Sequence, residues 1–151
     1  MLVPACKTTV VPTHAAHSPP RPVRLALAET HTLLRQALLR LLRADDDVLV
    51  VVESDRGEGL VASLGSRHVD VMVLDLPMPV GKALGLIRRV RHSRPTTAIL
   101  VMSMRADPQF AARVLDAGAR GYLTKDRAAQ ELLLAIHRLA AGQTYVSAAA
   151  A

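Results

Sequence analysis

Five short apolar runs that alternate with amphipathic stretches constrain the fold of this chain more than any other feature. The runs occupy residues 23–28, 48–52, 70–75, 98–103 and 121–124, and their Val, Ile and Leu content is typical of strands buried on both faces. The stretches that follow them have the length and the apolar spacing of helices. The pattern predicts an α/β fold, a doubly wound (βα)5 three-layer sandwich around a parallel five-stranded sheet with right-handed crossovers.

The first amphipathic stretch is expected to turn one apolar face toward the sheet. Its predicted inward residues are Leu33, Leu34, Ala37, Leu38, Leu41 and Leu42. Further helices are expected over about 56–66, 82–92, 108–118 and 128–141. Glycines make the helix at 56–66 the weakest of the set, because glycine loses the most backbone freedom in a helix.

The chain divides by composition into three parts. Residues 1–22 hold five of the nine prolines and are expected to form a disordered tail, because they cannot bury enough apolar surface to offset the entropy of ordering. Residues 23–147 are expected to form one folded domain. Residues 148–151 are four alanines, which we interpret as a tail or the remnant of a linker.

Composition also excludes several classes of protein. The chain has no Trp, one Phe and two Tyr, too few aromatic rings for a protein that binds single-stranded nucleic acid by stacking. Its formal charge of +6 comes from scattered arginines rather than from a basic block, so the charge is more simply explained by an arginine-rich composition than by a polyanion partner. A single cysteine, Cys6, excludes a disulfide framework, and no apolar stretch reaches the ~20 residues that span a bilayer. We therefore expect a cytoplasmic protein with no membrane partner.

Polar side chains follow four of the five predicted strands. Glu29 and Thr30 follow the first, Asp75 ends the third, Ser103 ends the fourth and Lys125 follows the fifth. Each alone is commonly structural, as a turn acid, a capping hydroxyl or a surface charge. Because the carboxyl ends of parallel strands share one edge, these groups are expected to converge. The set suits phosphoryl transfer, with a carboxylate as nucleophile, an ammonium and a hydroxyl to offset charge, and a second acid to help hold Mg²⁺.

Four blocks of sequence carry a resemblance to a known family. They are 27–31 (Leu-Ala-Glu-Thr-His), 74–79 (Leu-Asp-Leu-Pro-Met-Pro), 101–104 (Val-Met-Ser-Met) and 117–126 (Ala-Gly-Ala-Arg-Gly-Tyr-Leu-Thr-Lys-Asp). In these blocks the chain resembles the receiver domain of two-component response regulators, most closely the LuxR/NarL-type branch. The resemblance covers roughly residues 23–147 and implies a flavodoxin-like fold.

The resemblance also implies a role for each site residue. The implied phosphoacceptor is Asp75, the conserved lysine is Lys125, and the switch residues are Ser103 and Tyr122. The metal ligands expected for Mg²⁺ are Glu29, Asp75 and the backbone carbonyl of Pro77. Such domains accept a phosphoryl group from a sensor histidine kinase, catalyse at most their own phosphorylation and dephosphorylation, and then change an interaction or dimer surface, usually to control transcription. A homodimer is accordingly among the expected partners.

The chain departs from the family pattern at two places in the site and at its end. Thr30 stands where the family has a second acid that binds the metal, so Mg²⁺ binding is expected to be weak or lost. Lys82 stands where an acid is common, and it is a candidate to replace a bound cation. Most members of the branch continue into a DNA-binding helix-turn-helix, whereas this sequence stops at residue 151, so no direct DNA contact is expected from this segment.

Two alternatives therefore stay open beside a phosphorylated receiver. One is an atypical receiver that acts as a protein-interaction module without phosphorylation, which Thr30 and Lys82 favour. The other is a small α/β enzyme or a flavodoxin-type nucleotide binder. The second is disfavoured because residues 29–31 (Glu-Thr-His) stand where a Gly-rich phosphate loop would follow the first strand.

Overall fold

All five predicted strands form in the computed structural model, which describes residues 21–151. A sixth strand follows the last long helix. The strands are β1 (Val23–Ala28), β2 (Val48–Ser54), β3 (Val71–Asp75), β4 (Ala98–Ser103), β5 (Gly121–Thr124) and β6 (Tyr145–Val146). The helices are α1 (Thr32–Arg43), α2 (Gly57–Leu64), α3 (Val80–Ser93), α4 (Pro108–Asp116) and α5 (Ala128–Ala140), with short 3-10 helices η1 (Lys125–Arg127) and η2 (Ala148–Ala150). Residues 1–20 of the predicted disordered tail lie outside the described part of the chain.

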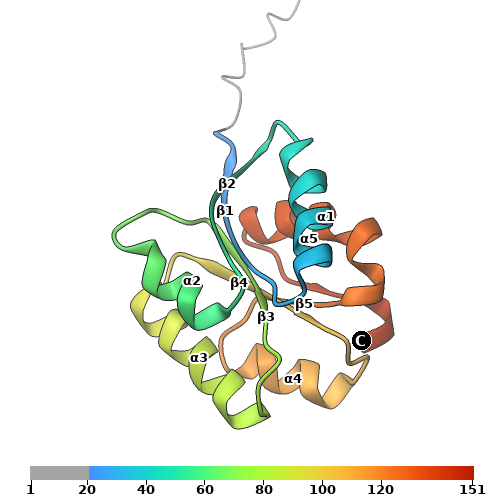
Figure 1. The fold of residues 1–151 in the computed structure, drawn as a ribbon. Helices are drawn as coiled ribbons and strands as arrows, with labels where there is room; N and C mark the ends of the chain where they lie inside the picture. The colour runs from blue at the N-terminus through green and yellow to red at the C-terminus, as the bar shows by residue number, and fades with distance from the viewer. Residues whose placement is uncertain (1–20) are drawn as a thin grey trace, which may run out of the picture.

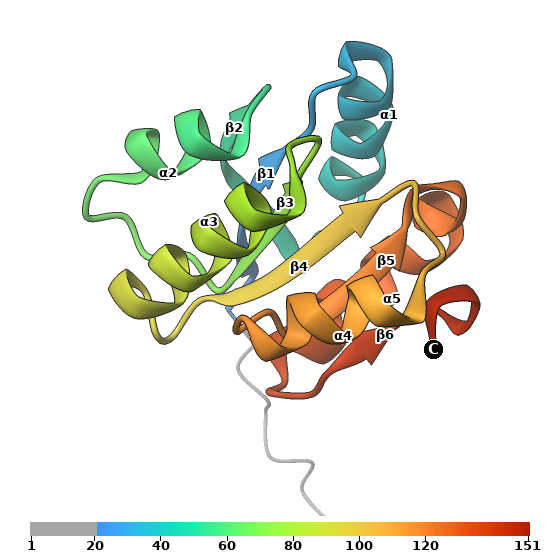
Figure 2. The ribbon, with the colours of Figure 1, turned by 90° about the horizontal axis from the view of Figure 1, so that it is seen from below.

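The sheet is parallel throughout and has the order β2-β1-β3-β4-β5-β6. Helices α1 and α5 cover one face, and α2, α3 and α4 cover the other, as the two views in Figure 1 and Figure 2 show. The predicted doubly wound, three-layer, flavodoxin-like architecture is therefore confirmed. Its consequence for the site is that β1, β3, β4 and β5 all point their carboxyl ends to the same edge.

Strand β3 lies at the centre of the sheet, between β1 and β4, and is buried along its whole length. Its side chains alternate between two apolar clusters. Val71 and Val73 pack in the cluster under α1 and α5, whereas Met72 and Leu74 pack in the cluster under α2, α3 and α4. Burial on both faces explains why this strand has no polar residue before Asp75.

The predicted inward face of α1 is wrong for two residues. Leu33 is 83% exposed and Ala37 is also exposed, whereas the buried leucines of this helix are Leu38, Leu39 and Leu42. The helix contains leucine doublets, so two neighbouring stripes have the same spacing. Periodicity cannot choose between them; packing against the sheet does.

The prediction of five strands is short by one, because β6 adds to the edge of β5. The Tyr145 N–H donates to the carbonyl of Arg120, and the Ser147 N–H donates to the carbonyl of Tyr122. Two residues are too few to produce an alternating pattern, which is why the strand escaped prediction. Beyond it, η2 buries Ala150 in the core, within the segment expected to be an alanine tail.

No helix in residues 21–151 is long and apolar enough to cross a membrane.

Candidate functional site

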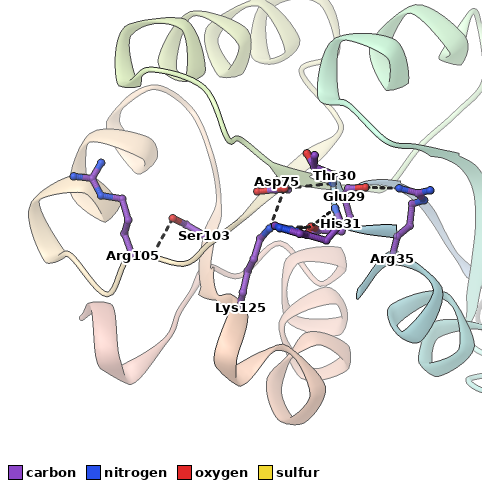
Figure 3. A network of polar contacts seen from close by, with 8 residues as sticks. All are labelled: Glu29, Thr30, His31, Arg35, Asp75, Ser103, Arg105 and Lys125. Carbon is purple, nitrogen blue, oxygen red and sulfur yellow. Dashed lines mark hydrogen bonds and ion pairs between the residues drawn. The ribbon is translucent and has the colours of Figure 1, made fainter. Parts of the chain in front are cut away.

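Asp75 is the last residue of β3 and is 4% exposed. The strand carries it to the carboxyl edge of the sheet, and the prolines at 77 and 79 prevent the chain from continuing as a strand. Its Oδ2 accepts the N–H of Thr30 at 3.4 Å and lies 2.9 Å from Nζ of Lys125 (Figure 3). One oxygen of the predicted nucleophile thus has partners from two other strand ends.

Lys125 begins η1 directly after β5, and its side chain is 5% exposed. Its Nζ lies 2.9 Å from Oδ2 of Asp75 and 2.9 Å from Oε1 of Glu29. A buried ammonium without counter-charges would be strongly unfavourable, and the two carboxylates supply them. The prediction that Lys125 lies beside Asp75 at the site is supported by this geometry.

Glu29 follows β1 and is completely buried. Its Oε1 accepts hydrogen bonds from Lys125 and from the backbone N–H of His31, while its backbone carbonyl accepts a hydrogen bond from Arg35 at 2.7 Å. Its other carboxylate oxygen, Oε2, is buried without a partner among the described residues. Buried carboxylate oxygens rarely stay unpaired, so this oxygen is suited to hold a cation.

The residues between β1 and α1 add a nitrogen to this site. Oxygens of Glu29 and Asp75 and a ring nitrogen of His31 all lie within 4.8 Å of one another. Thr30 contributes its backbone N–H to Asp75 but no carboxylate. Two carboxylates against one ammonium leave an excess of negative charge, which a divalent cation would offset. The donor set therefore fits a metal ion, with His31 in reach as a ligand that the sequence interpretation did not name.

Ser103 and Tyr122 are joined to each other through Arg105 rather than to Asp75. The Ser103 Oγ accepts the Arg105 N–H at 3.1 Å, and the Tyr122 hydroxyl donates to the Arg105 carbonyl. Figure 3 shows Ser103 at the end of β4, apart from the contacts of Asp75 and Lys125. Burial raises the pKa of Tyr122, whose ring packs edge-on against Phe110 at 5.8 Å. The two predicted switch residues thus both bind the backbone of Arg105, in the loop between β4 and α4.

The structure brings together Glu29, Asp75 and Lys125, as the sequence predicted, and places Ser103 at the same edge. It adds His31 and Arg105. The Glu-Thr-His order of residues 29–31 was the available signal for His31, since residues two apart in an extended segment can reach one site. Lys82, a candidate substitute cation, is exposed in the first turn of α3. The ammonium that lies between the two carboxylates is that of Lys125.

The fold and this group of side chains define a class: a doubly wound parallel α/β domain with an acid–lysine site at the carboxyl ends of its strands. Comparison with known proteins gives the family. The model of the response regulator receiver domain matches residues 25–137, and the chain belongs to this family.

Individual relatives of the chain are response regulators as well, or carry a regulatory name. The chain is 32% identical over 126 residues to the oxygen regulatory protein NreC of Staphylococcus epidermidis, covering 82% of this chain and 57% of that protein. It is 31% identical over 125 residues to the response regulator UvrY of Escherichia coli, covering 83% and 57%. The chain thus spans less than two thirds of the length of these curated relatives.

Solved structures show the same likeness. The signal receiver domain of the putative response regulator NarL from Mycobacterium tuberculosis matches with a TM-score of 0.74 at 30% identity, covering 82% of this chain and 100% of that one. The non-phosphorylated receiver domain of RcsB from Escherichia coli matches with a TM-score of 0.77 at 25% identity, covering 84% and 99%.

Proposed function

We propose that this receiver domain takes a phosphoryl group on Asp75 from a sensor histidine kinase, as part of a system that controls transcription. The observation that carries the proposal is the position of Lys125, whose buried ammonium is 2.9 Å from Oδ2 of Asp75. A carboxylate at a strand end is a competent nucleophile toward phosphorus, provided that positive charge is already in place for the transferred oxygens.

The proposed phosphoryl transfer needs no reactant other than the phosphorylated kinase and Asp75. An oxygen of Asp75 forms a bond to phosphorus while the bond from phosphorus to the kinase imidazole nitrogen breaks, and that nitrogen keeps the electron pair. Lys125 lies where it can pair with an oxygen of the arriving group, and moving there would loosen its contact with Asp75 or Glu29. The chain accepts one group on itself, so we infer self-catalysed phosphorylation rather than turnover of a separate substrate.

A divalent cation would offset the remaining charge on the phosphoryl oxygens. Glu29 and Asp75 are the carboxylates that would hold it, and the backbone carbonyl of Pro77 stays a predicted third ligand. The buried Oε2 of Glu29, which has no partner within residues 21–151, supports the assignment. Because Thr30 supplies no carboxylate, we expect Mg²⁺ to bind more weakly than at a site with three acids.

The Arg105 contacts suggest how the signal leaves the site. A phosphoryl oxygen that attracts the Ser103 hydroxyl would compete with the Arg105 N–H, and the Tyr122 bond to the Arg105 carbonyl would be disturbed with it. We infer that the loop before α4, and with it the surface of α4 and β5, is what a partner or a second copy detects. The predicted domain at 23–147, the homodimer and the cytoplasmic location belong to this proposal.

Intact-mass measurement after incubation with acetyl phosphate and Mg²⁺ tests the proposal. We expect one added phosphoryl group on the natural chain and none on Asp75→Asn. Asp116→Asn, which removes an exposed acid on α4, is the matched control and should label normally. Equal labelling of Asp75→Asn and the natural chain would overturn the assignment of Asp75.

A second function, a receiver that works without phosphorylation, is favoured by Thr30 and by the two ion pairs that already engage Lys125. Thr30→Asp separates the two. If the natural chain stays unlabelled while Thr30→Asp takes up the phosphoryl group, the site is intact but lacks a metal-binding acid, and the phosphorylation-independent function is the correct one.

A further inference from the structure

His31 occupies the N-cap position of α1 without acting as a cap. Its backbone is extended and its side chain makes no capping hydrogen bond to the helix. An N-cap side chain ordinarily accepts a backbone N–H of the first turn, and histidine is a poor choice for that task. Capping therefore does not explain why a histidine stands at this position.

The ring is turned toward the site at Asp75. Its Nδ1 lies 3.3 Å from Oε1 of Glu29, and the side chain is 71% exposed. An exposed ring can rotate at little cost, so either ring nitrogen can approach a cation held by the two carboxylates. The simplest alternative is that His31 makes an ordinary hydrogen bond to Glu29 and has no part in metal binding.

Glu29 provides the independent observation that points to a cation. Its Oε1 is occupied by Lys125 and by the His31 backbone, but its Oε2 is buried with no partner in residues 21–151. A carboxylate oxygen of Glu29, one of Asp75 and a ring nitrogen of His31 all lie within 4.8 Å of one another, which offers two carboxylates and one imidazole. At position 30 a hydroxyl replaces the third carboxylate.

Exchanging a carboxylate for an imidazole changes which metal such a site prefers. Mg²⁺ is a hard ion that takes oxygen ligands and keeps several waters. Imidazole nitrogen suits first-row transition ions, whose affinity for nitrogen-containing sites rises from Mn²⁺ through Co²⁺ to Ni²⁺. We propose that His31 is a nitrogen ligand of the cation site at Asp75 and makes that site prefer a divalent transition ion over Mg²⁺. The inference rests on the proposed function in that it concerns the metal of the same site.

Calorimetric titration of the full chain with Co²⁺ and, separately, with Mg²⁺ tests the inference. Both titrations use a chain that carries His14→Ala and His17→Ala, because these two histidines lie three positions apart in the sequence and could bind Co²⁺ on their own. We expect Co²⁺ to bind at least about tenfold more tightly than Mg²⁺, and His31→Ala to weaken Co²⁺ binding by about tenfold or more while changing Mg²⁺ binding little. Thr30→Asp should strengthen Mg²⁺ binding and so reduce the preference of the site for Co²⁺ over Mg²⁺.

Two controls keep the result specific. His92→Ala removes an exposed histidine near the end of α3 and should leave both affinities unchanged. Asp75→Asn should weaken both metals, which locates the binding at this site. Far-UV circular dichroism of each variant confirms that it is folded.

Titration needs no phosphoryl donor, so its result is independent of whether Asp75 is phosphorylated. Failure of acetyl phosphate labelling would count against the proposed function and leave the metal preference standing. Equal Co²⁺ to Mg²⁺ ratios in the natural chain and in His31→Ala would overturn the inference, as would Co²⁺ binding no tighter than Mg²⁺ in the natural chain.

Discussion

Nζ of Lys125 lies 2.9 Å from Oε1 of Glu29, although 96 residues separate the two along the chain. The same nitrogen lies 2.9 Å from Oδ2 of Asp75, so one ammonium bridges two buried carboxylates. The arrangement stabilises the site and keeps its charges in place for an incoming phosphoryl group. It also makes the site sensitive to the loss of any one of the three groups.

Lys125→Met should destabilise the domain by about 3–5 kcal/mol, because it leaves two buried carboxylates without their shared counter-charge. Urea unfolding followed by circular dichroism measures the loss. Arg127→Met is the matched control, since that exposed residue of η1 makes a long 3.7 Å ion pair with Glu131 and should cost less than about 1 kcal/mol. Equal stability of Lys125→Met and the natural chain would show that the ion pairs contribute nothing.

Tyr122→Phe should cost about 1 kcal/mol in the free energy of unfolding, because it removes the hydroxyl that bonds the Arg105 carbonyl and leaves the buried ring in place. Hydrogen exchange should accelerate in the loop between β4 and α4, while the amides of β1 and β3 keep their protection. Unchanged exchange in that loop would argue against a role for Tyr122 in holding it.

Ser147→Ala tests the strand that the sequence did not reveal. The Ser147 Oγ accepts the N–H of Thr124 at 3.2 Å and donates to Glu131 at 3.3 Å, inside the protein. Its loss leaves a buried N–H unpaired, and we expect a cost of about 1–3 kcal/mol in urea unfolding. Ser63→Ala, which removes an exposed hydroxyl on α2, should change stability by less than about 0.5 kcal/mol. If both variants behave alike, the Ser147 hydroxyl does not help to hold the end of the chain against β5.

The pH dependence of stability should include a contribution from Asp45. A hydrogen bond from His137 at 3.0 Å, together with the Asp47 N–H, lowers the pKa of Asp45 below its usual 3.8. A carboxyl whose pKa is lower in the folded state adds stability above its unfolded pKa and loses it as the pH falls through the folded pKa. Asp45→Asn should therefore be less stable than the natural chain at pH 7, and the difference should shrink in acid. Urea unfolding at several pH values measures it; a pH-independent difference would contradict the assignment.

Two leucines of α1 test the corrected helix face. Leu39→Ala removes a side chain that is 5% exposed and should cost about 2–5 kcal/mol, whereas Leu33→Ala removes one that is 83% exposed and should be nearly neutral. Thermal unfolding of the two variants is a direct comparison, because both change the same residue type in the same helix. The reverse order of costs would restore the face expected from the sequence.

The fold and the convergence of three site residues could be predicted from the sequence alone. Short apolar runs separated by helical stretches define a parallel doubly wound sheet, because only strands buried on both faces need to be apolar throughout. Since parallel strands share a carboxyl edge, that topology was enough to predict that Glu29, Asp75 and Lys125 would meet. These predictions rest on local pattern and on a general property of the fold.

Only the tertiary structure decided the features for which the local sequence pattern allows more than one arrangement. It chose between two leucine stripes on α1, because burial depends on how the helix rotates against the sheet. It added β6, whose two residues are held by β5 and by the buried Ser147 rather than by any propensity of their own. It also joined Ser103 and Tyr122 through Arg105, because contacts between different elements depend on distances that sequence spacing does not encode.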